Sequence, residues 1–233
     1  MKKSQKETDL KELCDFAVEN GATRAKVIDA GLIVIDERVQ LKCRYPPCLF
    51  YGKNLMCPPY TPSAKEFREY TAKYKHAIIV QIETPIEEEI KRRIGTKGAK
   101  LKELLKNYEL FEHGRAGWKK LVDVVSAVER EAFNKGYYLS LGLTAGTCRL
   151  CDTCDPKLPC KHPWEARPSM EAVGIDVHKT TKNAGLELKW NTKEFMTISG
   201  LILIDRRTIR DFKQQSILSQ LKTKRRKKCA IRI

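Results

Sequence analysis

The sequence lacks any long apolar run. No window approaches the roughly 18–20 apolar residues that a membrane-spanning helix needs. Residues 1–14 are polar and charged, without the apolar core of a secretory signal. We therefore expect no membrane association and a cytoplasmic location, where thiols stay reduced. The sequence also lacks the G-x-G-x-x-G fingerprint and the Walker A motif, so the two common nucleotide-binding loops are not indicated.

Histidine is scarce, with four residues, whereas cysteine is abundant, with nine. His76, His113 and His178 are scattered, which argues against a catalytic cysteine–histidine pair. In a reducing compartment, nine cysteines favour metal binding or catalysis over disulfides. Only Cys14 and Cys229 lie outside two short, proline-rich segments. Cys14 falls on the apolar face of an expected helix, so we interpret it first as a core residue.

The remaining seven cysteines form two sets. The first loop, residues 43–62, has the pattern C-x4-C-x8-C-P-P and contains five prolines. Because proline fixes φ and restricts the preceding residue, such a loop can hold thiols in place with little regular structure. The second loop, residues 146–163, has the pattern C-x2-C-x2-C-x5-C-x-H-P. The candidate ligands are Cys43, Cys48 and Cys57 in the first loop, and Cys148, Cys151, Cys154, Cys160 and His162 in the second.

The spacing in the second loop favours an iron–sulfur cluster. A [4Fe-4S] cluster takes up to four thiolates, and the C-x2-C-x2-C trio (Cys148, Cys151 and Cys154) supplies three from one tight turn. Either Cys57, which precedes a proline, or Cys160 completes the set. The other cysteines then serve a second cluster, and the sequence does not choose between the two pairings.

Either pairing leaves the second set one ligand short. The eighth ligand could be His162 or Cys14, or one iron could stay open to a substrate. For His162 we favour a hydrogen bond to a cluster sulfur or to the backbone over metal ligation.

Three functions follow from these alternatives. The first is a cytoplasmic iron–sulfur protein, with one or two [4Fe-4S] clusters, that transfers electrons to a redox partner protein or senses redox state. The second is an enzyme that binds a small-molecule substrate at an open iron. The third is a zinc-stabilised module, although a run of three closely spaced cysteines is less usual for one tetrahedral zinc.

A basic extension follows the cysteine-bearing part of the chain. Residues 205–233 hold eleven of the 45 Lys and Arg residues but only two of the 29 acidic ones. In the zinc alternative this tail could contact nucleic acid through phosphates. The run Lys222–Lys228 contains no aromatic residue to stack on bases, so a solvated extension is the favoured interpretation.

The hydrophobic pattern predicts an α/β or α+β fold, with a sheet, flanking helices and the two cysteine-rich loops in a single domain over residues 1–204. Strands are expected at 76–83, 137–143 and 195–204, the last with a bulge or turn at Gly200. A hairpin is expected from 25–29 and 32–41. Helices are expected at 6–19, 63–74, 86–111, 117–134 and 168–173.

Several ordered motifs resemble those of a known family. They are Cys43-Arg44-Tyr45-Pro46-Pro47-Cys48, Tyr51-Gly52, Cys57-Pro58-Pro59, the second loop, and Pro168-Ser169-Met170-Glu171-Ala172-Val173-Gly174-Ile175-Asp176-Val177. Together they resemble the uncharacterised family called domain of unknown function 2284, described as predicted metal-binding, over roughly residues 20–204. The resemblance implies metal binding by these cysteines in a prokaryotic, anaerobic, cytoplasmic protein. It implies no established reaction, and it stops before the basic tail.

Overall fold

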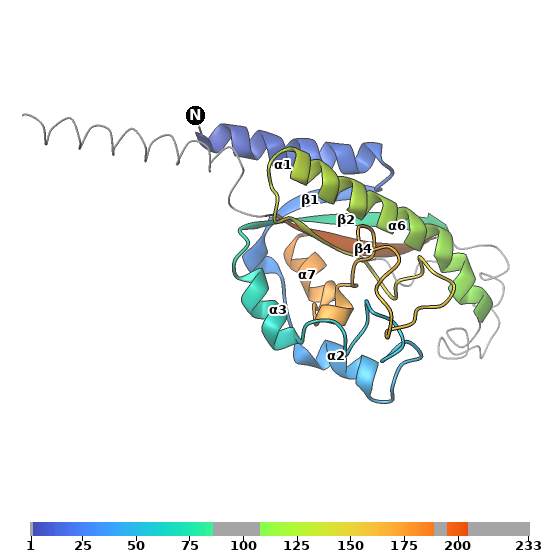
Figure 1. The fold of residues 1–233 in the computed structure, drawn as a ribbon. Helices are drawn as coiled ribbons and strands as arrows, with labels where there is room; N and C mark the ends of the chain where they lie inside the picture. The colour runs from blue at the N-terminus through green and yellow to red at the C-terminus, as the bar shows by residue number, and fades with distance from the viewer. Residues whose placement is uncertain (1, 86–107, 189–194, 205–233) are drawn as a thin grey trace, which may run out of the picture.

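A four-stranded antiparallel sheet forms the centre of the molecule. The computed structural model describes residues 2–85, 108–188 and 195–204. Within these residues the strand order is β1-β2-β4-β3, and helices cover both faces of the sheet (Figure 1). The strands are β1 (Arg24–Asp29), β2 (His76–Pro85), β3 (Leu141–Leu143) and β4 (Phe195–Ile204). The predicted fold class is confirmed, and the antiparallel pairing makes it α+β.

Two long helices cover one face of the sheet. They are α1 (Lys2–Glu19) and α6 (Tyr108–Asn134). Because side chains alternate along a strand, every second residue of β2 points towards these helices. The core on this face includes Leu13, Ile78, Val80, Leu121, Val125, Ile202 and Ile204. The helices predicted at 6–19 and 117–134 are therefore confirmed, and α6 begins earlier than expected.

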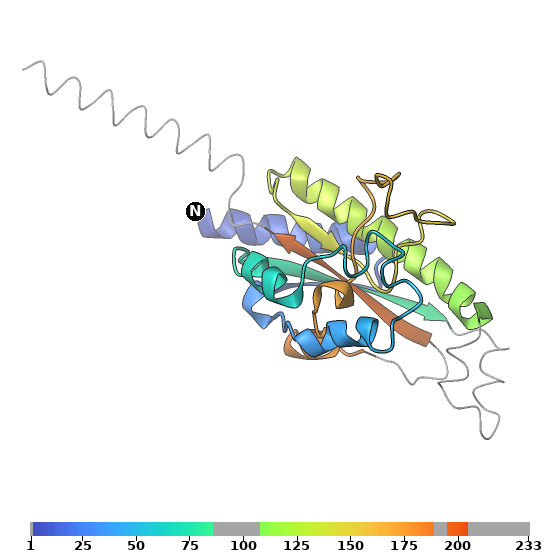
Figure 2. The ribbon, with the colours of Figure 1, turned by 60° about the horizontal axis from the view of Figure 1, so that its bottom comes forward.

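Shorter elements cover the opposite face. They are α2 (Glu37–Arg44), α3 (Ala64–Thr71), α7 (Val177–Asn183) and the 3-10 turn η2 (Glu171–Val173). The buried cluster on this face includes Phe67, Ala77, Ile79, Leu143, Met170, Val173, Ile175, Leu201 and Leu203. Figure 2 shows the first loop running between α2 and α3, with the second loop next to the first. This face therefore supplies the supports of the candidate site.

The hairpin predicted from residues 25–29 and 32–41 is wrong. β1 pairs with β2 instead, and after a 3-10 turn at Ala30–Leu32 the chain enters α2. The Asp36 side chain accepts a hydrogen bond from the Arg38 N–H and so caps this helix. The β-branched residues at 33–35 form only a short link, in which Ile35 makes an isolated bridge to Ile175.

Other predicted elements differ at their ends. The strand expected at 137–143 is limited to β3, because Tyr137 accepts a turn hydrogen bond from Ser140 N–H. The helix expected at 63–74 begins with the predicted capping box of Ser63 and Glu66 but ends at Thr71. The expected short helix at 168–173 is the 3-10 turn η2. Most of the helix expected at 86–111, and the basic tail, lie outside the described residues.

Gly200 marks a close approach rather than a bulge or turn. It pairs in register with Val80. A Cβ atom there would lie 2.9 Å from the main-chain oxygen of Leu143 and 2.8 Å from Val125 Cγ2. Glycine therefore allows α6 to pack closely on the sheet. None of the helices in the described ranges has the length and apolar character that crossing a bilayer requires.

Candidate metal centre

The first loop holds its thiols at the end of a helix and in tight turns. Cys43 lies in the last turn of α2, and Cys48 N–H donates a hydrogen bond of 2.9 Å to the Cys43 carbonyl oxygen. Cys57 N–H donates to the Asn54 carbonyl oxygen at 2.9 Å. Cys48 is exposed and Cys43 half-buried, whereas Cys57 is only 7% exposed. The three cysteines of the first loop therefore differ in exposure, from Cys48 at the surface to the buried Cys57.

The second loop leaves the end of β3, as the sequence predicted. Thr144 bridges to Ser169 beyond the loop, which brings the two ends of the loop together. Gly146 adopts a φ of 67°, a left-handed conformation that favours glycine, and turns the chain towards Cys148. At the far end, the Arg167 guanidinium forms an ion pair with Glu129 of α6, with a nitrogen–oxygen distance of 2.8 Å. The loop is thus anchored at both ends.

The two loops contact one another through three polar interactions. The Asn54 amide donates a hydrogen bond of 2.9 Å to the Cys148 carbonyl oxygen. Leu55 N–H lies 3.5 Å from Cys154 Sγ, to which it donates. Cys57 Sγ lies 3.4 Å from Thr147 Oγ1. Thiols from segments about ninety residues apart therefore belong to one region of the structure.

Within this region the four cysteines of the second loop share one pocket. Cys148, Cys151, Cys154 and Cys160 all line it, together with Asn54, Met56 and His162. Burial raises the pKa of Cys148, and the neighbouring thiols of this set raise it further. The structure therefore groups Cys160, rather than Cys57, with the trio.

The cysteines of the first loop form the other set. Burial, the Cys48 thiol and the Glu171 carboxyl raise the pKa of Cys43. Burial raises the pKa of Cys57 to about 11, and the nearby thiols of Cys48, Cys43 and Cys148 raise it as well. The hydrogen bond with Thr147 acts in the opposite direction and lowers the pKa. Cys57 therefore lies near residues of both loops: Cys43 and Cys48 in its own, and Thr147 and Cys148 in the second.

Backbone N–H groups point at several sulfurs. Phe50 N–H donates to Cys48 Sγ, and His162 N–H donates to Cys160 Sγ, each at 3.4 Å. The backbone of Leu150 does the same for Cys148 and lowers its pKa against the effect of burial. In all three cases the donor is two residues beyond the cysteine. Such donors stabilise a thiolate, which is the form that binds metal.

The donor set fits a soft metal. Sulfur ligands select zinc, copper(I) or iron–sulfur clusters over magnesium or calcium. The buried thiols favour the neutral form on their own, so a metal charge would be needed to hold them as thiolates. No group of three or more His, Cys, Asp or Glu side chains that could hold a metal ion is already assembled in the described ranges. Metal binding would therefore have to draw the thiols closer together.

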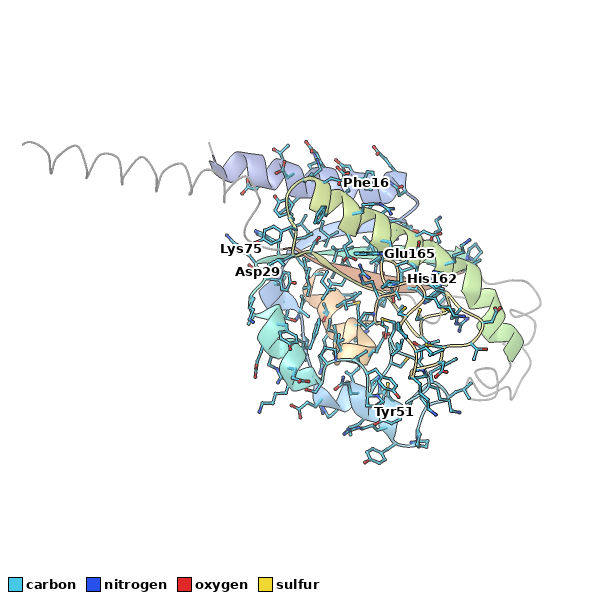
Figure 3. All side chains as sticks on the ribbon, in the orientation of Figure 1. Phe16, Asp29, Tyr51, Lys75, His162 and Glu165 are labelled. Carbon is cyan, nitrogen blue, oxygen red and sulfur yellow. The ribbon has the colours of Figure 1, made fainter. Side chains whose placement is uncertain are left out.

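Two proposed extra ligands lie away from the first-loop set. Cys14 packs against the core on the α1 and α6 face of the sheet, while the first loop lies on the opposite side, as Phe16 and Tyr51 show in Figure 3. His162 lines the pocket of the second-loop cysteines, with its Nδ1 atom 3.9 Å from Glu165 Oε2. Cys229 lies outside the described residues.

Sequence reasoning missed Glu171 as a site residue. Its side-chain oxygen Oε2 is buried and makes no hydrogen bond within the described part of the chain. The signal was present in the Pro168–Val177 motif, where an acidic residue stands among apolar ones. That motif supported the predicted helix at 168–173 and the family resemblance, but no ligand was assigned in it.

Comparison with known proteins supports a metal-related role. A family model described as predicted metal-binding protein (domain of unknown function 2284) matches residues 26–204. This range includes all seven cysteines of the two loops and Glu171, and it excludes the basic tail. No curated protein and no solved structure matches the chain.

Proposed function

Since this chain belongs to the predicted metal-binding family called domain of unknown function 2284, we propose that it is an iron–sulfur protein. Its role would be to transfer electrons or to sense redox state. The family description gives predicted metal binding. We infer iron and sulfide from the spacing of the cysteines.

The observation that carries the proposal is the shared pocket of Cys148, Cys151, Cys154 and Cys160. Three of these thiols come from one C-x2-C-x2-C turn, which is the arrangement that a [4Fe-4S] cluster uses. Such a cluster, when bound, would supply one-electron transfer. The first loop would supply the ligands of a second site.

The chain's own residues would tune the site. The N–H groups of Leu55 and His162 donate to Cys154 and Cys160, and hydrogen bonds to cluster sulfurs help to set the reduction potential. Asn54 and Met56 cover part of the pocket, which limits the access of water to the sulfurs. These contacts support a redox role for the site.

A protein partner is part of the proposal. Large apolar side chains are exposed on both loops (Tyr45, Leu49 and Leu158) and directly after the second loop (Trp164, which is 87% exposed). Exposed aromatic and apolar residues are typical of contact surfaces. Electron transfer needs a partner close to the cluster, and these side chains flank the thiols. We place the protein in the cytoplasm, where the thiols stay reduced.

Metal analysis of the full chain purified without oxygen tests the proposal. We expect a brown protein that contains iron and acid-labile sulfide. Replacing Cys151 with Ser should lower the iron content, whereas replacing Cys14 with Ser should leave it unchanged. A colourless protein with zinc and no sulfide would contradict the iron–sulfur assignment.

A further inference from the structure

Glu171 occupies an unusual position for an acidic residue. It begins η2 on the face of the sheet that carries α2 and α3. Its carboxyl group accepts hydrogen bonds from the Ser169 hydroxyl and the Gly146 N–H, but burial still raises its pKa. The Oε2 atom is buried and makes no hydrogen bond in the described ranges. A buried carboxylate oxygen without a partner costs folding free energy, so its retention calls for an explanation.

The surroundings of Glu171 include the Cys43 thiol of the first loop. Its carboxyl group lies close enough to Cys43 to raise the pKa of that thiol, after burial and Cys48. Gln40, one helical turn before Cys43, donates a hydrogen bond of 2.7 Å to the carbonyl oxygen of Ala172. Because residues three apart lie on one face of a helix, this bond holds Cys43 on the side of α2 that faces η2.

Cys57 is linked to Glu171 through two neighbouring residues of the second loop. Its sulfur lies 3.4 Å from Thr147 Oγ1, and the preceding Gly146 directs its backbone N–H towards the Glu171 carboxyl group. Cys43 from α2 and Cys57 from the first loop therefore both lie next to elements that contact Glu171. Cys48 is tied to Cys43 by the hydrogen bond across their turn.

We propose that Glu171 is the fourth protein ligand of a metal site formed with Cys43, Cys48 and Cys57. The inference rests on the proposed metal binding but not on whether the metal is iron or zinc. It replaces the open iron that the sequence alone leaves possible. It also fits the placement of Cys14 and His162, which lie elsewhere.

The chemistry of a carboxylate suits this position. Both zinc and iron accept Asp or Glu oxygen beside softer ligands. The positive charge of the metal would compensate the buried carboxylate, and the ligation would satisfy the unpaired Oε2 atom. Carboxylate oxygen is a harder ligand than thiolate, so a thiol-seeking metal should hold it least firmly of the four. This site should therefore exchange metal faster than the site in the second loop.

Metal retention in Glu171→Gln tests the assignment, with Glu69→Gln as the matched control because Glu69 is exposed on α3. Iron, zinc and sulfide are counted per chain, and metal release to a chelator is followed in the full protein. We expect Glu171→Gln to lose part of its metal. Outer-shell changes typically cost about 10–100-fold in metal affinity, so loss of a direct ligand should speed release from the first-loop site by at least that factor. Metal in the second loop and in Glu69→Gln should be unchanged.

The outcomes separate this inference from the proposed function. A wild-type protein without metal would overturn both. A wild-type protein with metal, and the same content and release rates in Glu171→Gln, would overturn the Glu171 assignment alone. If the variant fails to fold, X-ray absorption by the metal of the wild-type protein decides. An oxygen ligand beside sulfur is expected, and an all-sulfur shell would overturn the assignment.

Discussion

The side-chain amide of Asn54 donates a hydrogen bond of 2.9 Å to the main-chain oxygen of Cys148. The same side chain accepts a hydrogen bond from Met56 N–H at 2.9 Å, and the main-chain oxygen of Asn54 accepts one from Cys57 N–H. Asn54 is 6% exposed. One buried residue therefore fixes the inner part of the first loop and joins it to the first cysteine of the second.

Replacing Asn54 with Ala should weaken metal binding without removing a ligand. The change leaves the Cys148 carbonyl oxygen and the Met56 N–H without their partner, so the loops should separate more easily. Outer-shell changes of this kind typically cost 10–100-fold in metal affinity. Competition with a chelator measures the effect.

Asn20→Ala is the matched control for this change. The Asn20 amide donates to the Phe16 carbonyl oxygen at the exposed end of α1, far from the loops. It should leave metal affinity unchanged. Equal affinity in Asn54→Ala and the wild type would show that the two loops do not depend on this contact.

Replacing Arg167 with Met should destabilise the fold and release the far end of the second loop. Arg167 makes two-pronged contact with Glu129 at 2.8–3.2 Å, and both side chains are mostly buried. Removing one partner of a buried pair leaves an uncompensated charge and costs about 3 kcal/mol or more in unfolding free energy. Urea denaturation of the metal-free protein measures it.

A second substitution identifies the cause. The double variant Arg167→Met with Glu129→Leu has no unpaired charge, so it should regain part of the lost stability. The pair of Arg38 and Asp36 provides the control because its arginine is 78% exposed, and ion pairs at the surface contribute little. If Arg38→Met destabilises the protein as much as Arg167→Met, burial of the ion pair is not the reason.

The sequence predicted the elements whose signals are local. The capping box at Ser63 and the apolar periodicity of α6 depend on neighbouring residues, and both were found. The strand at 76–83 was also found, because a continuous apolar run must be buried on both faces. The two cysteine loops were recognised from spacing alone.

The misses concern long-range contacts. Residues 37–44 form a helix because Asp36 caps it and because β1 finds its partner in β2, about fifty residues later. Local rules predicted a bulge or turn at Gly200, but glycine is needed there because α6 packs closely on the sheet. Glu171 becomes a candidate ligand only when η2 is placed beside α2, which no spacing in the sequence reveals.

Cys14 should behave as a half-buried thiol with no part in metal binding. Burial raises its pKa to about 11, and the nearby Asp15 carboxylate adds to this effect. A raised folded-state pKa favours the neutral thiol, so its contribution to stability is complete below pH 9. It is lost as the pH rises from 9 towards 11. Stability should therefore fall less steeply over this range in Cys14→Ala than in the wild type.

Alkylation gives an independent measurement of the Cys14 thiol. In folded protein at pH 8, iodoacetamide should modify Cys14 more slowly than the exposed Cys48, because only the thiolate reacts. Peptide mass spectrometry of the metal-free chain separates the two sites. Fast modification of Cys14 would contradict its placement against the core.

Replacing Thr147 with Val should shift the reduction potential while keeping the metal. The Thr147 hydroxyl lies 3.4 Å from Cys57 Sγ in a buried position. Valine has nearly the same shape but cannot donate to sulfur, so negative charge on the sulfur would be less well stabilised. The reduced state, which carries more negative charge, should be destabilised most, and the potential of the first-loop site should become more negative.

The control is Thr181→Val, since the Thr181 hydroxyl donates to the Val177 carbonyl oxygen within α7. Redox titration followed by absorption or electron paramagnetic resonance compares the two variants, and an unchanged potential in Thr147→Val would mean that Cys57 is not a cluster ligand.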